Sequence, residues 1–157
     1  MEKDWINSMG HLIHGIYVLT AAHEGKINGM IASWVSQVSY DPPLIMVAVH
    51  PNRYSHSLIE KGNAFALHIL SQDQKDFLKR FKGPDPLFKF SALEWTRAKT
   101  GCPILRDCLG YLDCRVKTSL KPGNHTLFFG EVLEAQMLGF GKPMSTLDYE
   151  GTYLGKD

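Results

Sequence analysis

The chain has 157 residues with 17 basic and 16 acidic side chains, giving a formal net charge of +1. A balance this close to neutral argues against nucleic acid or an anionic membrane surface as the partner. The length suits a single domain over residues 1–157, and a hydrophobic fraction of 44% is typical of a globular protein that buries an apolar core.

Export, membrane insertion and metal binding find no support in the sequence. No apolar run reaches the roughly 20 residues that span a bilayer, and residues 1–5 lack the basic start and apolar stretch of an export signal. The chain has three cysteines, an odd number, at Cys102, Cys108 and Cys114. Their spacing matches no usual zinc or iron–sulfur ligand pair. We expect reduced, structural cysteines, no metal site and a cytoplasmic location.

The first half of the chain predicts a short helix followed by strands. Asp4 is a candidate cap for the helix, and the chain then turns at Gly15 into a strand over residues 16–21. Residues 23–26 form a hairpin turn in which Gly25 can take a positive φ. After this turn we expect one long strand over residues 27–39, a break at Asp41-Pro42-Pro43, and a strand over residues 44–49 that is buried on both faces.

The second half alternates short helices with strands. A helix after residue 52 has Asn52 or Ser55 as its cap and ends at Gly62, and a second helix after the cap Ser71 runs to residue 81. Strands are expected over 64–70, 110–120 and 125–138, the last two joined by a turn at 121–124. Many strands without βαβ alternation predict a mainly β fold, a closed antiparallel barrel with a few short helices in its connections.

The stretch "NGMIASWVS", residues 28–36, differs from an ordinary core strand. Gly29 allows another group to approach the backbone closely, and one strand face would mix a small residue, an aromatic ring and a hydroxyl group in Ala32, Trp34 and Ser36. Such a face can line a slot for a flat heteroaromatic ligand. The alternative is a barrel strand whose serines satisfy a neighbouring backbone.

Two further segments contain candidate binding residues. "HPNRYSHSL" places Arg53, Ser55 and His56 around a predicted helix N-terminus, where exposed N–H groups and the helix dipole attract phosphate; the alternative is a capped helix with solvated charges. His125 opens a strand after a tight turn, so it can reach a ligand at a barrel rim or simply be solvated. His68, inside an apolar strand, is expected to be a hydrogen-bonded core residue.

Together, "GIYVLTA", "NGMIASWVSQVSYDPPLIMVAV", "SHSLIEKGNAFALHIL" and "GNHTLFFGEV" resemble the flavin reductase-like family over roughly residues 5 to 155. This resemblance implies a split β-barrel that binds FMN, with FAD as the alternative, usually as a homodimer. It also implies that residues 28–36 and 49–55 line the flavin, with Arg53, Ser55 and His56 near its phosphate. The implied cofactor-binding residues are Asn28, Gly29, Met30, Ile31, Ala32, Ser33, Trp34, Val35, Ser36, Val49, His50, Pro51, Asn52, Arg53, Ser55 and His56.

The resemblance also assigns a nicotinamide or substrate region. His125 matches a Gly-Asp-His-Thr element associated with nicotinamide binding, but this chain has Asn124 in place of the aspartate. Tyr149 and Tyr153 correspond to a segment that closes the site in some relatives.

The implied function is that of an NAD(P)H:flavin oxidoreductase, which passes electrons to free flavin, ferric iron or a partner protein. No catalytic side chain is expected, because the flavin carries the chemistry. One alternative is a flavoredoxin-like electron carrier with bound FMN and little direct NAD(P)H activity; another is a flavin-binding sensor or storage module.

Overall fold

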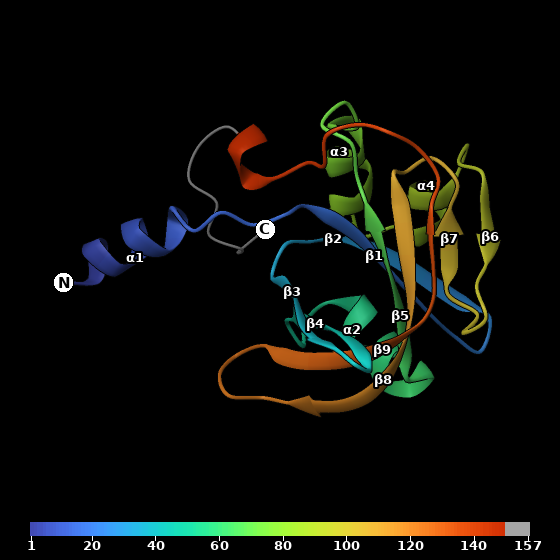
Figure 1. Cartoon of the computed structure of the whole chain (residues 1–157), viewed down its shortest axis with the longest axis horizontal. Helices are drawn as coiled ribbons and strands as arrows, with labels where there is room; N and C mark the ends of the chain where they lie inside the picture. The colour runs from blue at the N-terminus through green and yellow to red at the C-terminus, as the bar shows by residue number, and fades with distance from the viewer. Residues whose placement is uncertain (150–157) are drawn as a thin grey trace.

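The structure is a computed structural model that describes residues 1–149 (Figure 1). Its helical elements are α1 (Glu2–Gly10), α2 (Tyr54–Gly62), α3 (Asp76–Lys82), α4 (Pro86–Phe90) and the 3-10 turn η1 (Thr146–Asp148). Its strands are β1 (Tyr17–His23), β2 (Lys26–Ala32), β3 (Val35–Tyr40), β4 (Pro43–Val49), β5 (Ala64–Ile69), β6 (Trp95–Arg97), β7 (Pro103–Leu105), β8 (Gly110–Leu120) and β9 (Thr126–Met137).

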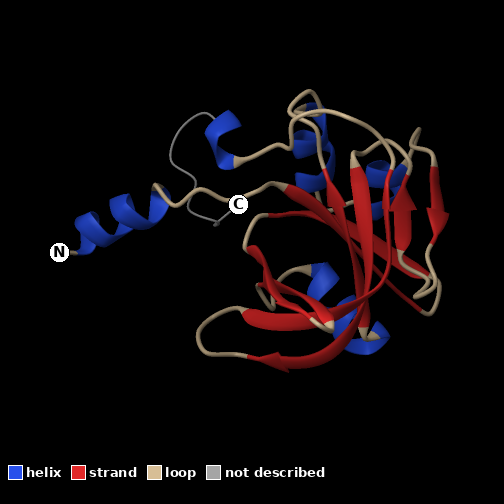
Figure 2. Ribbon diagram, in the orientation of Figure 1, coloured by secondary structure: helices blue, strands red, loops and turns tan. Residues whose placement is uncertain are grey.

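Seven of the strands form one antiparallel sheet in the order β2-β1-β5-β8-β9-β4-β3, which curls into a barrel (Figure 2). The two edge strands, β2 and β3, are joined by the chain itself through Ser33 and Trp34. At this junction the Ala48 N–H donates to the Trp34 carbonyl oxygen over 2.9 Å. The prediction of a mainly β, split antiparallel barrel with short helices in its connections is confirmed.

Both predicted hairpin turns are present. His23 pairs with Lys26, and the residues between them, Glu24 and Gly25, have φ of 48° and 78°, the pair of positive values that a type I′ turn requires. The turn between β8 and β9 joins Leu120 to its partner Leu127. The first turn thus sets the register of β1 and β2, whereas the register of β8 and β9 shifts twice along the hairpin, between Asp113 and Cys114 and between Val116 and Thr118.

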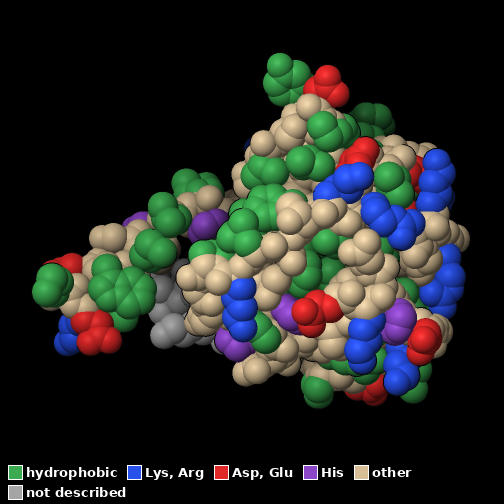
Figure 3. Space-filling view, turned by 90° about the horizontal axis from the view of Figure 1, so that it is seen from below, with side chains coloured by type: hydrophobic (Ala, Val, Ile, Leu, Met, Phe, Trp, Pro, Cys, Tyr) green, Lys and Arg blue, Asp and Glu red, His purple; other side chains and the backbone are tan. Residues whose placement is uncertain are grey.

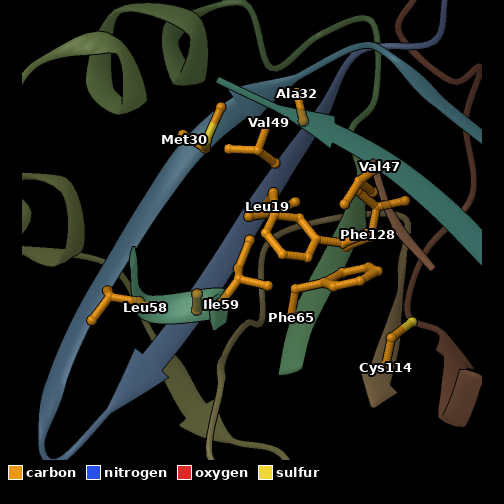
Figure 4. Packing of buried hydrophobic residues seen from close by; sticks show 12 residues of the cluster. Leu19, Met30, Ala32, Val47, Val49, Leu58, Ile59, Phe65, Cys114 and Phe128 are labelled. Atoms are coloured by element: carbon orange, nitrogen blue, oxygen red, sulfur yellow. The ribbon is translucent and has the colours of Figure 1, made fainter. Parts of the chain in front are cut away.

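Apolar side chains fill the barrel (Figure 4). Alternate residues of each strand point inward, as the two-residue strand period requires, and Leu58 and Ile59 of α2 pack among them. The buried members of this barrel core are Leu19, Ala21, Met30, Ala32, Val47, Val49, Leu58, Ile59, Phe65, Leu67, Cys114 and Phe128. A packed interior of this kind leaves the rim and the outer surface of the barrel for binding a ligand.

A second apolar cluster lies between the sheet and helices α3 and α4, with Phe77, Phe81 and Phe90 at its centre. The aromatic rings of both helices lie close to Gly29 of β2: a Cβ atom there would lie 2.8 Å from Cε1 of Phe81 and 3.4 Å from Cζ of Phe90. The close backbone approach expected at Gly29 is therefore made by a core aromatic ring.

Several local predictions were wrong. The strand expected over 27–39 is interrupted at Ser33 and Trp34, so side-chain alternation does not continue across it. No side chain caps α1, α2 or α3: α2 has Arg53 at its N-cap position and α3 begins only at Asp76. The helix α4 and strands β6 and β7 were not predicted, because their segments are too short to show a period.

Candidate functional site

Residues 28–36, expected to line a binding slot, place most of their side chains inside the protein. Met30 and Ala32 belong to the barrel core. Ile31 packs against the second cluster, and Val35 packs against the barrel core. Ser36 is exposed and donates a hydrogen bond to the Gln37 carbonyl oxygen. Ser33 is buried as well, whereas Trp34 is partly exposed, so Trp34 is the side chain of this segment best placed to meet a ligand.

Asn28 connects two other parts of the chain. Its side-chain nitrogen donates to Oγ of Ser55 over 3.0 Å, and its side-chain oxygen accepts from Nζ of Lys89 over 3.0 Å. Lys89 Nζ also donates to the Gly29 carbonyl oxygen over 2.8 Å. The three side chains, from β2, α2 and α4, are buried and form one polar network between apolar clusters.

Lys89 is a cation whose side chain is only 4% exposed. Both acceptors of its hydrogen bonds are neutral amide oxygens. Burial, followed by the positive charge of Arg53, lowers its pKa to about 8, and Asp85 opposes this only in part. An ammonium group can donate three hydrogen bonds, so this network leaves donor capacity and uncompensated positive charge beside Arg53.

The segment between β4 and α2 approaches the same region. Pro51 and Asn52 form the turn, and the Asn52 N–H donates to Nδ1 of His50 over 3.1 Å. Arg53 then occupies the N-cap position of the nine-residue helix α2. The positive end of this helix and the Arg53 charge thus lie at the same place as the Lys89 network, which favours an anion there.

His56 has partners within the fold. Its Nε2 lies 2.8 Å from Oγ1 of Thr126, and its Nδ1 lies 3.3 Å from a carboxylate oxygen of Glu60. The ring packs edge-on against Phe128 of the barrel core, with centroids 5.2 Å apart. Through these contacts His56 joins α2 to β9. Ser55, one residue earlier, is hydrogen bonded to Asn28 instead.

Three rings from separate segments meet at the rim. The His125 ring lies 4.7 Å from the Trp34 ring and 5.2 Å from the His50 ring, between centroids. Trp34 comes from the junction of β2 and β3, His50 follows β4, and His125 precedes β9. The structure therefore brings together the three predicted segments, and all three rings are partly exposed.

The electrostatic surroundings of His125 disfavour its charged form. Burial, followed by the His50 and Arg53 charges, lowers the pKa of His125. Its Nδ1 lies 2.8 Å from the side-chain oxygen of Asn124. Because this oxygen can only accept, Nδ1 carries the proton of the neutral ring.

The two tyrosines assigned to the segment that closes the site differ in whether the structure describes them. Tyr149 lies beside α3, where Nζ of Lys82 is 5.3 Å from the centre of its ring; Tyr153 falls outside the described residues.

Lys89 was not predicted from the sequence as a residue of the site. The available signal was a lysine within the apolar run "PLFKF", next to residues that became buried.

The predicted structural residues behave as expected. His68 is fully buried, with Nδ1 3.0 Å from the Val18 carbonyl oxygen, and its Nε2 accepts the Leu105 N–H over 3.1 Å. The three cysteines are unpaired and buried.

Within residues 1–149 no cluster of three potential metal ligands occurs, and no helix in this range is long and apolar enough to cross a membrane.

Comparison with known proteins identifies a family. The family model described as "Flavin reductase like domain" matches residues 9–155. The chain is 35% identical, over 144 residues, to the reductase component of 4-nitrophenol 4-monooxygenase/4-nitrocatechol 2-monooxygenase from Rhodococcus opacus, covering 92% of this chain and 76% of that protein.

Two further relatives extend the comparison. Diflavin flavoprotein A 1 from Synechocystis sp. is 35% identical over 143 residues, covering 87% of this chain but 24% of that protein, so the chain spans about a quarter of its length. The solved structure of a nitrilotriacetate monooxygenase component B homologue from Mycobacterium thermoresistibile has a TM-score of 0.84 and 26% identity, covering 99% of this chain and 84% of the other.

Proposed function

Because this chain belongs to the flavin reductase-like family, we propose that it is a flavoprotein oxidoreductase that takes hydride from NAD(P)H. Electrons then pass to free flavin, ferric iron or a partner protein. The observation that carries the proposal is the buried ammonium of Lys89, held by neutral acceptors beside Arg53 at the start of α2.

A phosphate group is the anion this region suits. Lys89 and Arg53 supply two positive charges, and the first turn of α2 adds the positive end of a helix dipole. A phosphate placed here neutralises a buried charge that Asp85 offsets only in part. We therefore assign the phosphate end of a flavin to Lys89 and Arg53, at the first turn of α2.

The flavin ring is assigned to the rim beside Trp34. The partly exposed Trp34 side chain offers an apolar face to the ring. Residues 50–52, between β4 and α2, continue the wall. His125 then lies where a nicotinamide can approach.

A bound flavin supplies the hydride acceptance and electron transfer. The chain itself holds the phosphate end at Lys89 and Arg53 and shields one side of the site with the Trp34 ring. It also orients the His125 ring through the hydrogen bond between Nδ1 and Asn124. A site built around a single phosphate favours FMN over FAD. The relative named as a reductase component supports turnover with NAD(P)H over the role of a passive electron carrier.

The partners are also part of the proposal. The name of the Rhodococcus opacus relative makes an oxygenase that consumes reduced flavin a suitable class of acceptor. A homodimer is supported by apolar side chains left exposed on the projecting N-terminal segment (Figure 3). They include Trp5 and Met9 of α1 and Ile13, which follows that helix. Tyr40, at the end of edge strand β3, is 87% exposed. A cytoplasmic location is supported by the three unpaired cysteines.

The first test is spectroscopic. Protein purified aerobically, or reconstituted with FMN, should show a flavin absorption spectrum that bleaches when NADH or NADPH is added without oxygen. Failure to bind FMN and FAD would contradict the flavin assignment. A flavin that stays oxidised with both nucleotides, but is reduced by a protein partner, would instead support the electron carrier.

A further inference from the structure

Asn124 stands immediately before His125 in the turn between β8 and β9, and the two side chains are hydrogen bonded over 2.8 Å. The contact is made by the oxygen of an uncharged amide. An amide oxygen selects the ring form with the proton on Nδ1, as a carboxylate would, but it adds no negative charge to stabilise a second proton.

The other groups that act on His125 also disfavour its protonation. His50, at the end of β4, and Arg53, at the start of α2, both add positive potential. Trp34 packs against the ring and reduces its exposure to water. Within residues 1–149, the charged and titratable groups acting on His125 are these two basic side chains.

We propose that Asn124 is a positioning residue that holds His125 as a neutral imidazole, with Nδ1 protonated and Nε2 available to accept a hydrogen bond from the reductant. This inference rests on the proposed function. The carboxamide of a reduced nicotinamide carries N–H donors, so it suits an acceptor at this position. A protonated ring would instead present a donor there and would favour a different orientation of the carboxamide.

A neutral ring also fits the change in charge during the reaction. The nicotinamide loses a hydride, which is one proton with two electrons, to the flavin, and its ring becomes a cation. An imidazolium nearby would oppose this new positive charge in a region that already holds Arg53 and Lys89. The neutral His125 avoids that repulsion, so the Asn124 contact favours the oxidised nucleotide.

The direct test is nitrogen NMR of the flavin-free protein labelled with 15N, titrated from pH 5 to 9. The His125 signals are assigned by their loss in His125→Gln. In the wild type we expect the Nδ1-protonated neutral ring throughout the neutral range. Asn124→Asp should raise the pKa of His125 by about one unit or more, because a carboxylate then contacts the ring. Asn124→Ala should leave the ring neutral but mix its two tautomers.

Kinetics supply the functional half of the test. Anaerobic reduction of FMN-loaded wild type by its preferred nucleotide should be nearly independent of pH between 7 and 8.5. In Asn124→Asp the same rate should change severalfold around the His125 pKa that NMR reports. An Nε2-protonated ring in the wild type, or equal His125 pKa values in wild type and Asn124→Asp, would overturn the inference. Loss of flavin reduction with the NMR result intact would instead count against the proposed function.

Discussion

The ammonium nitrogen of Lys89 lies 3.0 Å from the side-chain oxygen of Asn28, although 61 positions separate the two residues. The same asparagine donates to Ser55 of α2. Two connections of the barrel are thereby tied to strand β2 by one buried amide. This arrangement places a positive charge at the start of α2, where the proposed phosphate site lies.

Replacing Lys89 with methionine should weaken phosphate-dependent flavin binding. Lys89→Met keeps the length of the side chain but removes its charge and donors, and a charge-assisted hydrogen bond of this kind corresponds to about tenfold or more in affinity. Fluorescence titration should show weaker FMN binding and unchanged riboflavin binding, since riboflavin lacks the phosphate. Lys61→Met, an exposed lysine at the far end of α2, is the matched control. An equal loss for both ligands would place the phosphate elsewhere.

Replacing Trp34 should weaken the binding of FMN and riboflavin alike, without the selectivity expected for Lys89→Met. Trp34→Leu removes an aromatic face beside the proposed ring site, where stacking contributes about 1 kcal/mol beyond the buried area. We expect FMN and riboflavin to lose affinity by the same factor, roughly fivefold, in the same titration. Unchanged binding of both ligands would show that the ring lies away from the junction of β2 and β3.

Gly29 should tolerate no side chain, for reasons of packing alone. In Gly29→Ala the new methyl group would lie 2.8 Å from Phe81, whose ring is buried and held between Phe77 and Phe90. Overpacking of this kind costs about 1–3 kcal/mol in the free energy of unfolding. Urea denaturation measures it. Gly83→Ala is the control, because a Cβ there meets nothing within 4 Å; equal stability of the two variants would refute the packing account.

The buried His68 should make the fold sensitive to acid. Burial lowers its pKa from 6.5 to about 4, so between these values the unfolded chain binds the proton more readily than the folded one. Its contribution is complete above pH 6.5 and is lost as the pH falls through about 4. The difference corresponds to about 3 kcal/mol of unfolding free energy.

Urea denaturation at several pH values checks this effect. His68→Gln should have a lower stability at pH 7 and a shallower loss of stability between pH 6.5 and 4 than the wild type. His11→Gln, which changes an exposed histidine on the projecting N-terminal segment, should keep the wild-type slope. Parallel curves for wild type and His68→Gln would assign the acid sensitivity to other groups.

The strands and tight turns could be predicted because they depend on neighbouring residues. A positive φ at Gly25, the continuous apolar runs of β1 and β5 and the alternating sequence of β8 are local properties. The break at Ser33 and Trp34 was not predictable in this way. There the chain passes from one edge of the sheet to the other, and the Ala48 contact replaces normal pairing. Sequence periodicity cannot show how a sheet closes on itself.

The sequence by itself determined most of the long strands, the tight turns, the flavin reductase-like family and all segments of the candidate site except the one that contains Lys89. Only the tertiary structure decided which side chains of those segments remain for binding. Met30, Ala32 and Val49 pack in the barrel core, whereas Lys89 reaches Asn28 from a helix that showed no pattern. The physical reason is that side-chain direction follows local backbone geometry, while a partner 61 positions away is set by barrel closure and helix packing, which depend on the whole chain.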